Sequence, residues 1–187
     1  MAKASRDLHD EIRGHFLLAR LNVRGIFERS VVWIYRFSEG EGASGLILNR
    51  PLGKTLAACA PMFAGTPAGS VPVFEGGPVE PDRLCFVVRS RGALDGNSSV
   101  RVGASPDEIR DVIFNPSVSV GGFAGRAEWA RGQLEDELAR GTWMRVRMDA
   151  EAWDAGGGVD FWRRLVAKIR RPEAALMLRA PAALEDN

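Results

Sequence analysis

The sequence predicts an α+β domain, in which strands and helices form separate clusters. The chain has 187 residues, of which 45% are hydrophobic, and this is enough to fill the core of one domain. Short apolar runs rich in β-branched and aromatic residues follow one another in groups. Helix signals fall between these groups, whereas a doubly wound sheet requires strict alternation. We therefore expect a single domain over residues 1–172 and a frayed tail over residues 173–187.

The first third of the chain favours strands. The runs GHFLLAR (14–20) and VVWIYRF (31–37) are typical of buried strands, and a loop or one helical turn separates them. GLILN (45–49) is a third short strand, which Pro51 ends. The Ala-rich segment 53–64 predicts a helix.

The middle of the chain begins with a turn-dense connection, EGGPVEPDR, which leads into a buried strand at residues 84–89. After a surface turn, GALDGNSS, a brief strand is expected at 100–102. Ser105 then begins the clearest helix signal. Its hydroxyl can cap the helix, Pro follows at the first helical position, and Glu108 completes a capping box. This helix should extend to about Phe114.

The last third of the chain mixes both elements. VSVGGF from Val118 predicts a strand, and residues 132–141 predict a helix that ends at Gly141 in a left-handed conformation. WMRVRM from Trp143 alternates with period two and predicts another strand. After a Gly-rich hinge, residues 160–171 predict a final amphipathic helix.

The charge and the cysteines restrict the function. With 25 basic and 24 acidic residues the net charge is +1, which excludes a globally basic nucleic-acid binder. The two cysteines, Cys59 and Cys85, lie in apolar surroundings, where we interpret them as buried and inert. The polar N-terminus lacks the apolar region of a signal peptide, and no later apolar run could span a membrane. We therefore expect a cytoplasmic protein without a membrane role.

Familiar catalytic and nucleotide motifs are incomplete. GEGASG (40–45) matches the dinucleotide pattern, but a short strand and a proline follow it, so a hairpin turn explains it better. The sequence at 53–55, GKT, lacks the preceding glycine of a P-loop. His9 and His15 have no metal-ligand spacing. We expect no metal, no cofactor and no catalytic residues.

Three polar or glycine-rich segments form the candidate ligand site. Asn49 and Arg50 follow a strand and could form an anion hook, while Gln133 opens a helix whose free amides could receive an anion. Gly76 and Gly77 permit a close backbone approach. Our hypothesis is a pocket for a small anionic ligand, such as a nucleotide. The alternative is that these residues only lock turns together.

The last helix is a second candidate surface. Its apolar residues share one face, and basic residues occupy the other, so it could contact an acidic partner, a phosphate backbone or a membrane surface. The alternative is an ordinary surface helix, whose apolar face packs on the domain and whose charged side chains are solvated. The candidate nucleic-acid or partner patch consists of Arg163, Arg164, Lys168 and Arg171.

Three motifs in order resemble the AlgH/YqgE family of small bacterial proteins. They are Gly45 with Asn49-Arg50-Pro51, the turn Gly76-Gly77-Pro78-Val79, and Gly132-Gln133-Leu134-Glu135. The resemblance covers most of residues 12–148. It implies an α+β fold whose bifurcated mixed sheet forms a pseudo-barrel with helices packed around it, divisible into two subdomains. It also implies a role in transcriptional regulation and supplies no catalytic residue or cofactor.

The chain departs from the family pattern before the third motif. Arg126-Ala127-Glu128 intervene between Gly125 and Trp129, and Arg131 stands where proline is usual. A ligand that contacts this segment would meet different side chains in this protein.

These observations lead to one functional hypothesis and two alternatives. The first is a non-enzymatic, indirect transcriptional regulator that binds a small anionic ligand. Direct DNA binding is disfavoured, because the sequence shows no helix-turn-helix and its charge is balanced. The second is a protein-interaction module that uses exposed Trp129 and Trp153. The third is a hydrolase or transferase acting on a phosphorylated metabolite, which requires a titratable group near Asn49 and Arg50.

Overall fold

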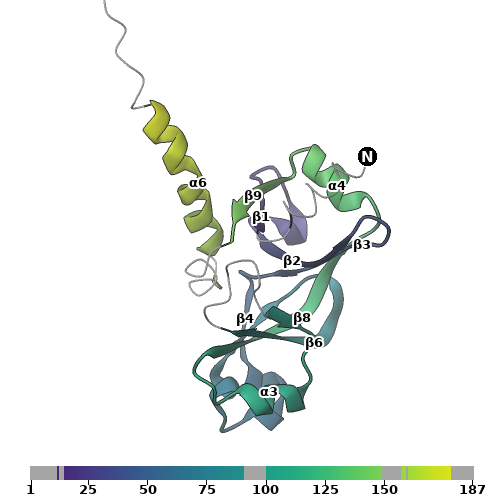
Figure 1. Cartoon of the computed structure of the whole chain (residues 1–187), viewed down its shortest axis with the longest axis vertical. Helices are drawn as coiled ribbons and strands as arrows, with labels where there is room; N and C mark the ends of the chain where they lie inside the picture. The colour runs from purple at the N-terminus through teal and green to yellow at the C-terminus, as the bar shows by residue number, and fades with distance from the viewer. Residues whose placement is uncertain (1–11, 13–14, 91–99, 149–156, 159, 178–187) are drawn as a thin grey trace, which may run out of the picture.

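A computed structural model describes residues 12, 15–90, 100–148, 157–158 and 160–177, and side chains of the last helix as far as residue 169. Along these residues, nine strands form one mixed sheet, and helices lie against it (Figure 1). The predicted surface turn within residues 91–99 lies outside the described residues.

The first layer of the sheet is an antiparallel meander. Strands β1 (His15–Ala19), β2 (Val31–Ser38) and β3 (Gly42–Ile47) pair in order, and β9 (Trp143–Arg147) pairs with β1 on its other side. The 3-10 turn η1 (Gly25–Phe27) connects β1 to β2. Four strands are present where the sequence predicts them, but β3 begins three residues earlier and ends two residues earlier than the predicted range 45–49, and Pro51 opens the next strand.

The second layer contains the middle of the chain. Its strands pair with β8 or with one another, and β6 carries an irregular register between Val79 and Leu84. This strand therefore begins inside the segment predicted to be a turn. The strands are β4 (Pro51–Thr55), β5 (Pro72–Glu75), β6 (Val79–Ser90) and β7 (Val100–Val102).

Strand β8 (Val118–Trp129) belongs to both layers. Its first part pairs antiparallel with β6 and, over Gly122–Ala124, parallel with β5. Its last part, Ala127–Trp129, pairs with β3 of the first layer. Over the described residues the path β4-β5-β8-β3-β2-β1-β9 has two open ends, so the sheet splits at β8 and does not close. The expected α+β class and bifurcated mixed sheet are confirmed.

Two of the helices begin and end as their sequences predict. Helix α3 (Pro106–Val112) has the full capping box, in which Ser105 Oγ accepts from Glu108 N and Ser105 N donates to the Glu108 carboxylate. Helix α4 (Gln133–Ala139) ends before Gly141, whose φ of 71° is left-handed.

The predicted helix over residues 53–64 is wrong for most of its length. Its first residues, 53–55, pair with β5 as strand β4, because Gly53 and Thr55 have low helix propensity and the pairing with β5 decides their conformation. Only α2 (Leu56–Cys59) is α-helical, and Pro61 then opens the 3-10 turn η2 (Pro61–Phe63), which is followed by η3 (Pro67–Ser70).

The last helix is longer than its sequence predicts. Helix α6 (Phe161–Met177) continues through Pro172 for five residues. Ala174, Ala175 and Leu176 favour helix strongly, and this offsets the missing N–H of the proline. The helix extends from one end of the molecule, and α3 lies at the other (Figure 1). No helix in the described part of the chain is long and apolar enough to cross a membrane.

The first layer is buried on both faces because alternate residues of its strands point to opposite sides. Phe16 and Leu18 pack with Phe161 and Leu165 of α6, whereas Leu17 packs on the other side with residues of β8, β9 and α4. A third cluster lies between the second layer, α2 and α3. The anchor of α6 is Trp162, whose indole N–H donates to Ala19 O at 2.8 Å.

Candidate functional site

Asn49 and Arg50 hold the connection between β1 and β2. The Asn49 side chain is buried, accepts from Val31 N at 2.9 Å and donates to Arg29 O at 2.9 Å. The Arg50 guanidinium donates to the carbonyls of Ile26 and Glu28, at 3.0 and 2.6 Å. The side-chain donors predicted to bind an anion therefore donate to main-chain carbonyls of the loop between β1 and β2.

Gly76 and Gly77 pass against the backbone of β8. Gly76 N donates to Ala124 O at 2.7 Å, and Gly76 O accepts from Ile47 N at 2.9 Å. A Cβ atom at either glycine would lie closer than 3.0 Å to this backbone. The two glycines therefore allow their own backbone to pack closely against β8, at the position where the sequence predicts a ligand.

Gln133 belongs to a network around the carboxylate of Glu137. The Gln133 amide accepts from Ala130 N and donates to Glu137 Oε1, both at 3.0 Å. Glu137 Oε2 accepts the indole N–H groups of Trp129 and Trp143, at 2.9 and 2.8 Å. Both tryptophans are buried and contact Phe27.

The structure places Asn49, Arg50 and Gln133 near the connection between β1 and β2, and it places Gly76 and Gly77 against β8. Asn49 and Arg50 bind the carbonyls of residues 26–29 from one side, and Phe27 of that loop packs on the tryptophans held by Glu137 and Gln133. The hydrogen bonds are those of the alternative interpretation, in which these residues lock turns together. Three cavities in the described part of the chain, of about 840, 790 and 220 Å³, are lined by residues other than the five predicted for the ligand.

The predicted basic patch on α6 is exposed. Arg163 pairs with Asp160 at 3.2 Å, and the Arg164 guanidinium lies 5.6 Å from the centre of the Phe161 ring. Lys168 is exposed as well, whereas the side chain of Arg171 lies outside the described residues. No group of three or more His, Cys, Asp or Glu residues that could hold a metal ion occurs in the described part of the chain.

A cleft rimmed by arginines opens where the two layers of the sheet diverge. Its volume is about 790 Å³, within the range of small-molecule sites. Trp33, Tyr35, Cys85 and Phe86 contribute aromatic and apolar surface. Four of its lining side chains are guanidinium groups, and no carboxylate of the described residues lines it. The arginines are Arg36, Arg83, Arg101 and Arg126.

Most of these arginines are already paired. Arg101 contacts Glu108 at 2.6 Å, Arg83 contacts Glu80 at 3.3 Å, and Arg126 contacts both Glu80 and Glu128. Arg36 donates only to the Ser44 hydroxyl, from Nε and Nη2 at 3.3 and 3.1 Å, among the contacts of the described residues. Four cations against three carboxylates leave the rim with one net positive charge, centred on Arg36.

The remaining titratable groups of the cleft stay neutral. Burial raises the pKa of the Cys85 thiol, and burial likewise raises the pKa of the Tyr35 phenol. A thiol with a raised pKa is a weak nucleophile, and a neutral phenol is a hydrogen-bond donor. The cleft therefore offers binding groups more readily than reactive ones.

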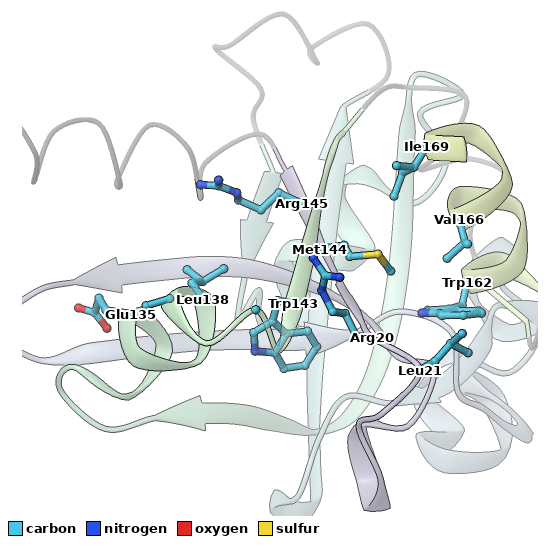
Figure 2. A pocket seen from close by; sticks show the side chains of 12 residues that line it. Arg20, Leu21, Glu135, Leu138, Trp143, Met144, Arg145, Trp162, Val166 and Ile169 are labelled. Carbon is cyan, nitrogen blue, oxygen red and sulfur yellow. The ribbon is translucent and has the colours of Figure 1, made fainter. Parts of the chain in front are cut away.

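A second hollow lies beside α6 (Figure 2). It has a volume of about 840 Å³ and extends over β9 from α6 toward α4. Trp162, Val166 and Ile169 face Met144 across it, and Leu21, with 57% of its surface exposed, lies at its rim. Its charged lining residues are Arg20, Arg145 and Glu135.

The split-sheet α+β architecture, with its glycine crossings and turn-locking network, defines a fold that solved bacterial proteins share. A crystal structure of a protein from Corynebacterium diphtheriae matches with a TM-score of 0.63 and 26% identity, over 84% of this chain and 85% of that one. The solution structure of the AlgH protein from Pseudomonas aeruginosa shares the fold, with a TM-score of 0.64 and 24% identity, over 92% and 96% of the two chains.

Sequence comparison agrees with the fold. The AlgH-like family matches residues 16–173. A UPF0301 protein from Azoarcus sp. (strain BH72) is 38% identical over 72% of this chain and 77% of its own. A UPF0301 protein from Mycobacterium leprae (strain TN) is 31% identical over 89% and 85%. The chain belongs to the AlgH-like family.

Proposed function

We propose that this protein binds a small anionic ligand with an aromatic or apolar group in the arginine cleft, without converting it. The observation that carries the proposal is the lining itself, in which four arginines stand beside the aromatic residues Trp33, Tyr35 and Phe86. Guanidinium groups pair with carboxylates and phosphates, and aromatic rings take up the apolar part of a ligand. The raised pKa values of Cys85 and Tyr35 favour binding over catalysis.

Such a protein can act as an indirect regulator, because a ligand alters the population of conformations that a partner meets. We extend the proposal to a cytoplasmic regulator that does not bind DNA itself. The four cleft arginines are neutralised in part by Glu80, Glu108 and Glu128, which suits one small anion better than a phosphate backbone.

Anion binding is tested by replacing Arg36. We expect phenylacetate and phenyl phosphate, titrated calorimetrically, to bind the wild type and to bind Arg36→Gln about tenfold more weakly, because one charge-assisted hydrogen bond is lost. Arg110→Gln is the matched control, since Arg110 is exposed on α3 and pairs with Asp107.

Neutral phenylacetamide should bind the wild type less well than phenylacetate. Equal affinities of phenylacetate for the wild type and the Arg36 variant, or no binding of either anion, would contradict the proposal.

The hollow beside α6 supports a second candidate function, the binding of a partner protein. Trp129 cannot serve it as predicted, because only 3% of its surface is exposed, and Trp153 lies outside the described residues. The hollow instead presents Leu21, Met144 and Ile169 beside two arginines and one glutamate. This surface fits an amphipathic helix whose polar face carries acidic residues.

This candidate is tested with a synthetic helix of about 18 residues, with leucines at i, i+3, i+4 and i+7 and glutamates elsewhere. We expect Leu21→Glu to weaken its binding, measured by fluorescence anisotropy, about tenfold, because a charge replaces an apolar contact. Leu52→Glu is the control, since Leu52 is an exposed leucine of β4, outside the hollow. A peptide in which lysines replace the glutamates should bind more weakly. If it binds equally well, or if Leu21→Glu and Leu52→Glu have the same affinity for the acidic peptide, the hollow does not bind the helix.

A further inference from the structure

We infer that Glu80 is an internal competitor in the arginine cleft, whose carboxylate holds the guanidinium groups that a ligand anion would use. The inference rests on the proposed anion binding and adds a residue that sets its affinity. The Glu80 carboxylate contacts Nη1 of Arg126 and Nη1 of Arg83, and both arginines line the cleft. One carboxylate therefore occupies donors that come from two strands, β8 and β6.

The backbone of Glu80 is held in an unfavourable conformation. Its φ is +50°, in the left-handed region that non-glycine residues seldom adopt. It lies where the β6 register shifts, between Val79 and Leu84, so main-chain pairing does not fix its side chain. Such strain persists where the surrounding structure enforces it.

The other two carboxylates at the rim are held differently. Glu108 closes the capping box of α3, where its carboxylate accepts from Ser105 N at 2.7 Å. Glu128 binds Nε of Arg126 at 2.6 Å from the same strand, two residues away. The contacts of the Glu80 side chain within the described structure are both to guanidinium groups, and 44% of that side chain is exposed.

Glu80 can therefore swing into solvent when another anion arrives. The incoming anion takes the two Nη1 donors, and the released carboxylate becomes hydrated. Glu80 Oε2 accepts from both guanidinium groups, and a carboxylate oxygen of a ligand reproduces this contact most closely. The inferred ligand class is accordingly an aromatic or apolar carboxylate.

The test compares two variants that each remove one negative charge from Arg126. We expect Glu80→Gln to bind phenylacetate about two- to fivefold more tightly than the wild type, the range expected for an exposed ion pair. Glu128→Gln is the matched control, because it frees Nε and leaves Glu80 in place, and its affinity should rise less. Glu80→Gly, which suits the positive φ, should reproduce the tighter binding.

The role of Glu80 and anion binding by the cleft can fail separately. If the wild type binds phenylacetate and neither Glu80→Gln nor Glu80→Gly binds it more tightly, the competing role of Glu80 is wrong and anion binding still stands. Equal gains for Glu80→Gln and Glu128→Gln also overturn it, since general charge would then explain both. If the wild type and all variants fail to bind either aromatic anion, anion binding itself falls, and the inference falls with it.

Discussion

Replacing Gly77 with alanine should prevent the protein from folding stably. Gly77 has a φ of +151°, and a Cβ atom there would lie closer than 3.0 Å to the backbone of Arg126 and Ala127. Backbone cannot move aside as a side chain can, so the segment that contains Gly77 must move away from β8. The expected loss exceeds about 4 kcal/mol of the roughly 5–15 kcal/mol that stabilise a domain.

Gly53→Ala is the control for this substitution. Gly53 also has a positive φ, of +68°, but nothing lies within 4 Å of the position of its Cβ. We expect a loss of about 1 kcal/mol there, from conformational strain alone. Urea unfolding followed by circular dichroism measures both variants. Similar midpoints for the two would show that the close approach to β8 is not what requires Gly77.

Replacing Glu137 with leucine should have the second largest effect. Its Oε2 atom accepts two indole N–H groups, from Trp129 and Trp143, whose side chains are almost completely buried. Leucine leaves both donors without an acceptor, at about 1–3 kcal/mol each, so we expect a loss of about 2–6 kcal/mol. The measurement is the free energy of unfolding in urea, followed by circular dichroism because the variant alters tryptophan fluorescence directly.

Two further variants isolate the cause. Glu137→Gln keeps one acceptor oxygen for the indoles and should lose less stability than the leucine variant. Asp136→Ala removes a neighbouring carboxylate that is 74% exposed and lies 3.8 Å from Arg140, and it should be nearly neutral. A leucine variant as stable as the wild type would mean that the indole bonds contribute little.

Local signals in the sequence predicted local structure well. The capping box at Ser105 and the left-handed Gly141 are correct because each depends on contacts within one turn of chain. The helix expected at 53–64 is wrong because pairing with β5, a contact distant in sequence, decides the conformation of β4. The same reason explains why β8 is longer than predicted, since its last residues are held by β3.

The residues predicted for the ligand site lie in connections or at the start of a helix, and they line none of the three cavities in the described part of the chain. The residue types at Asn49, Gly76 and Gln133 predict a ligand site, whereas in the structure their polar atoms bind neighbouring segments of the chain. The cleft arginines form no motif, because they come from four separate stretches of sequence that only the fold brings together. One signal was present: Arg126 and Glu128 lie in the segment where the chain departs from the family pattern.

The position of β8 in the chain has a consequence for synthesis. This strand supplies the hydrogen-bonding partner of β3, β5 and β6, yet it begins only at residue 118. While the nascent chain is shorter, these three strands each have an unpaired edge, and such edges are the places where chains associate wrongly. A growing polypeptide of this protein therefore stays vulnerable to aggregation until residues 118–129 have left the ribosome and closed all three edges at once.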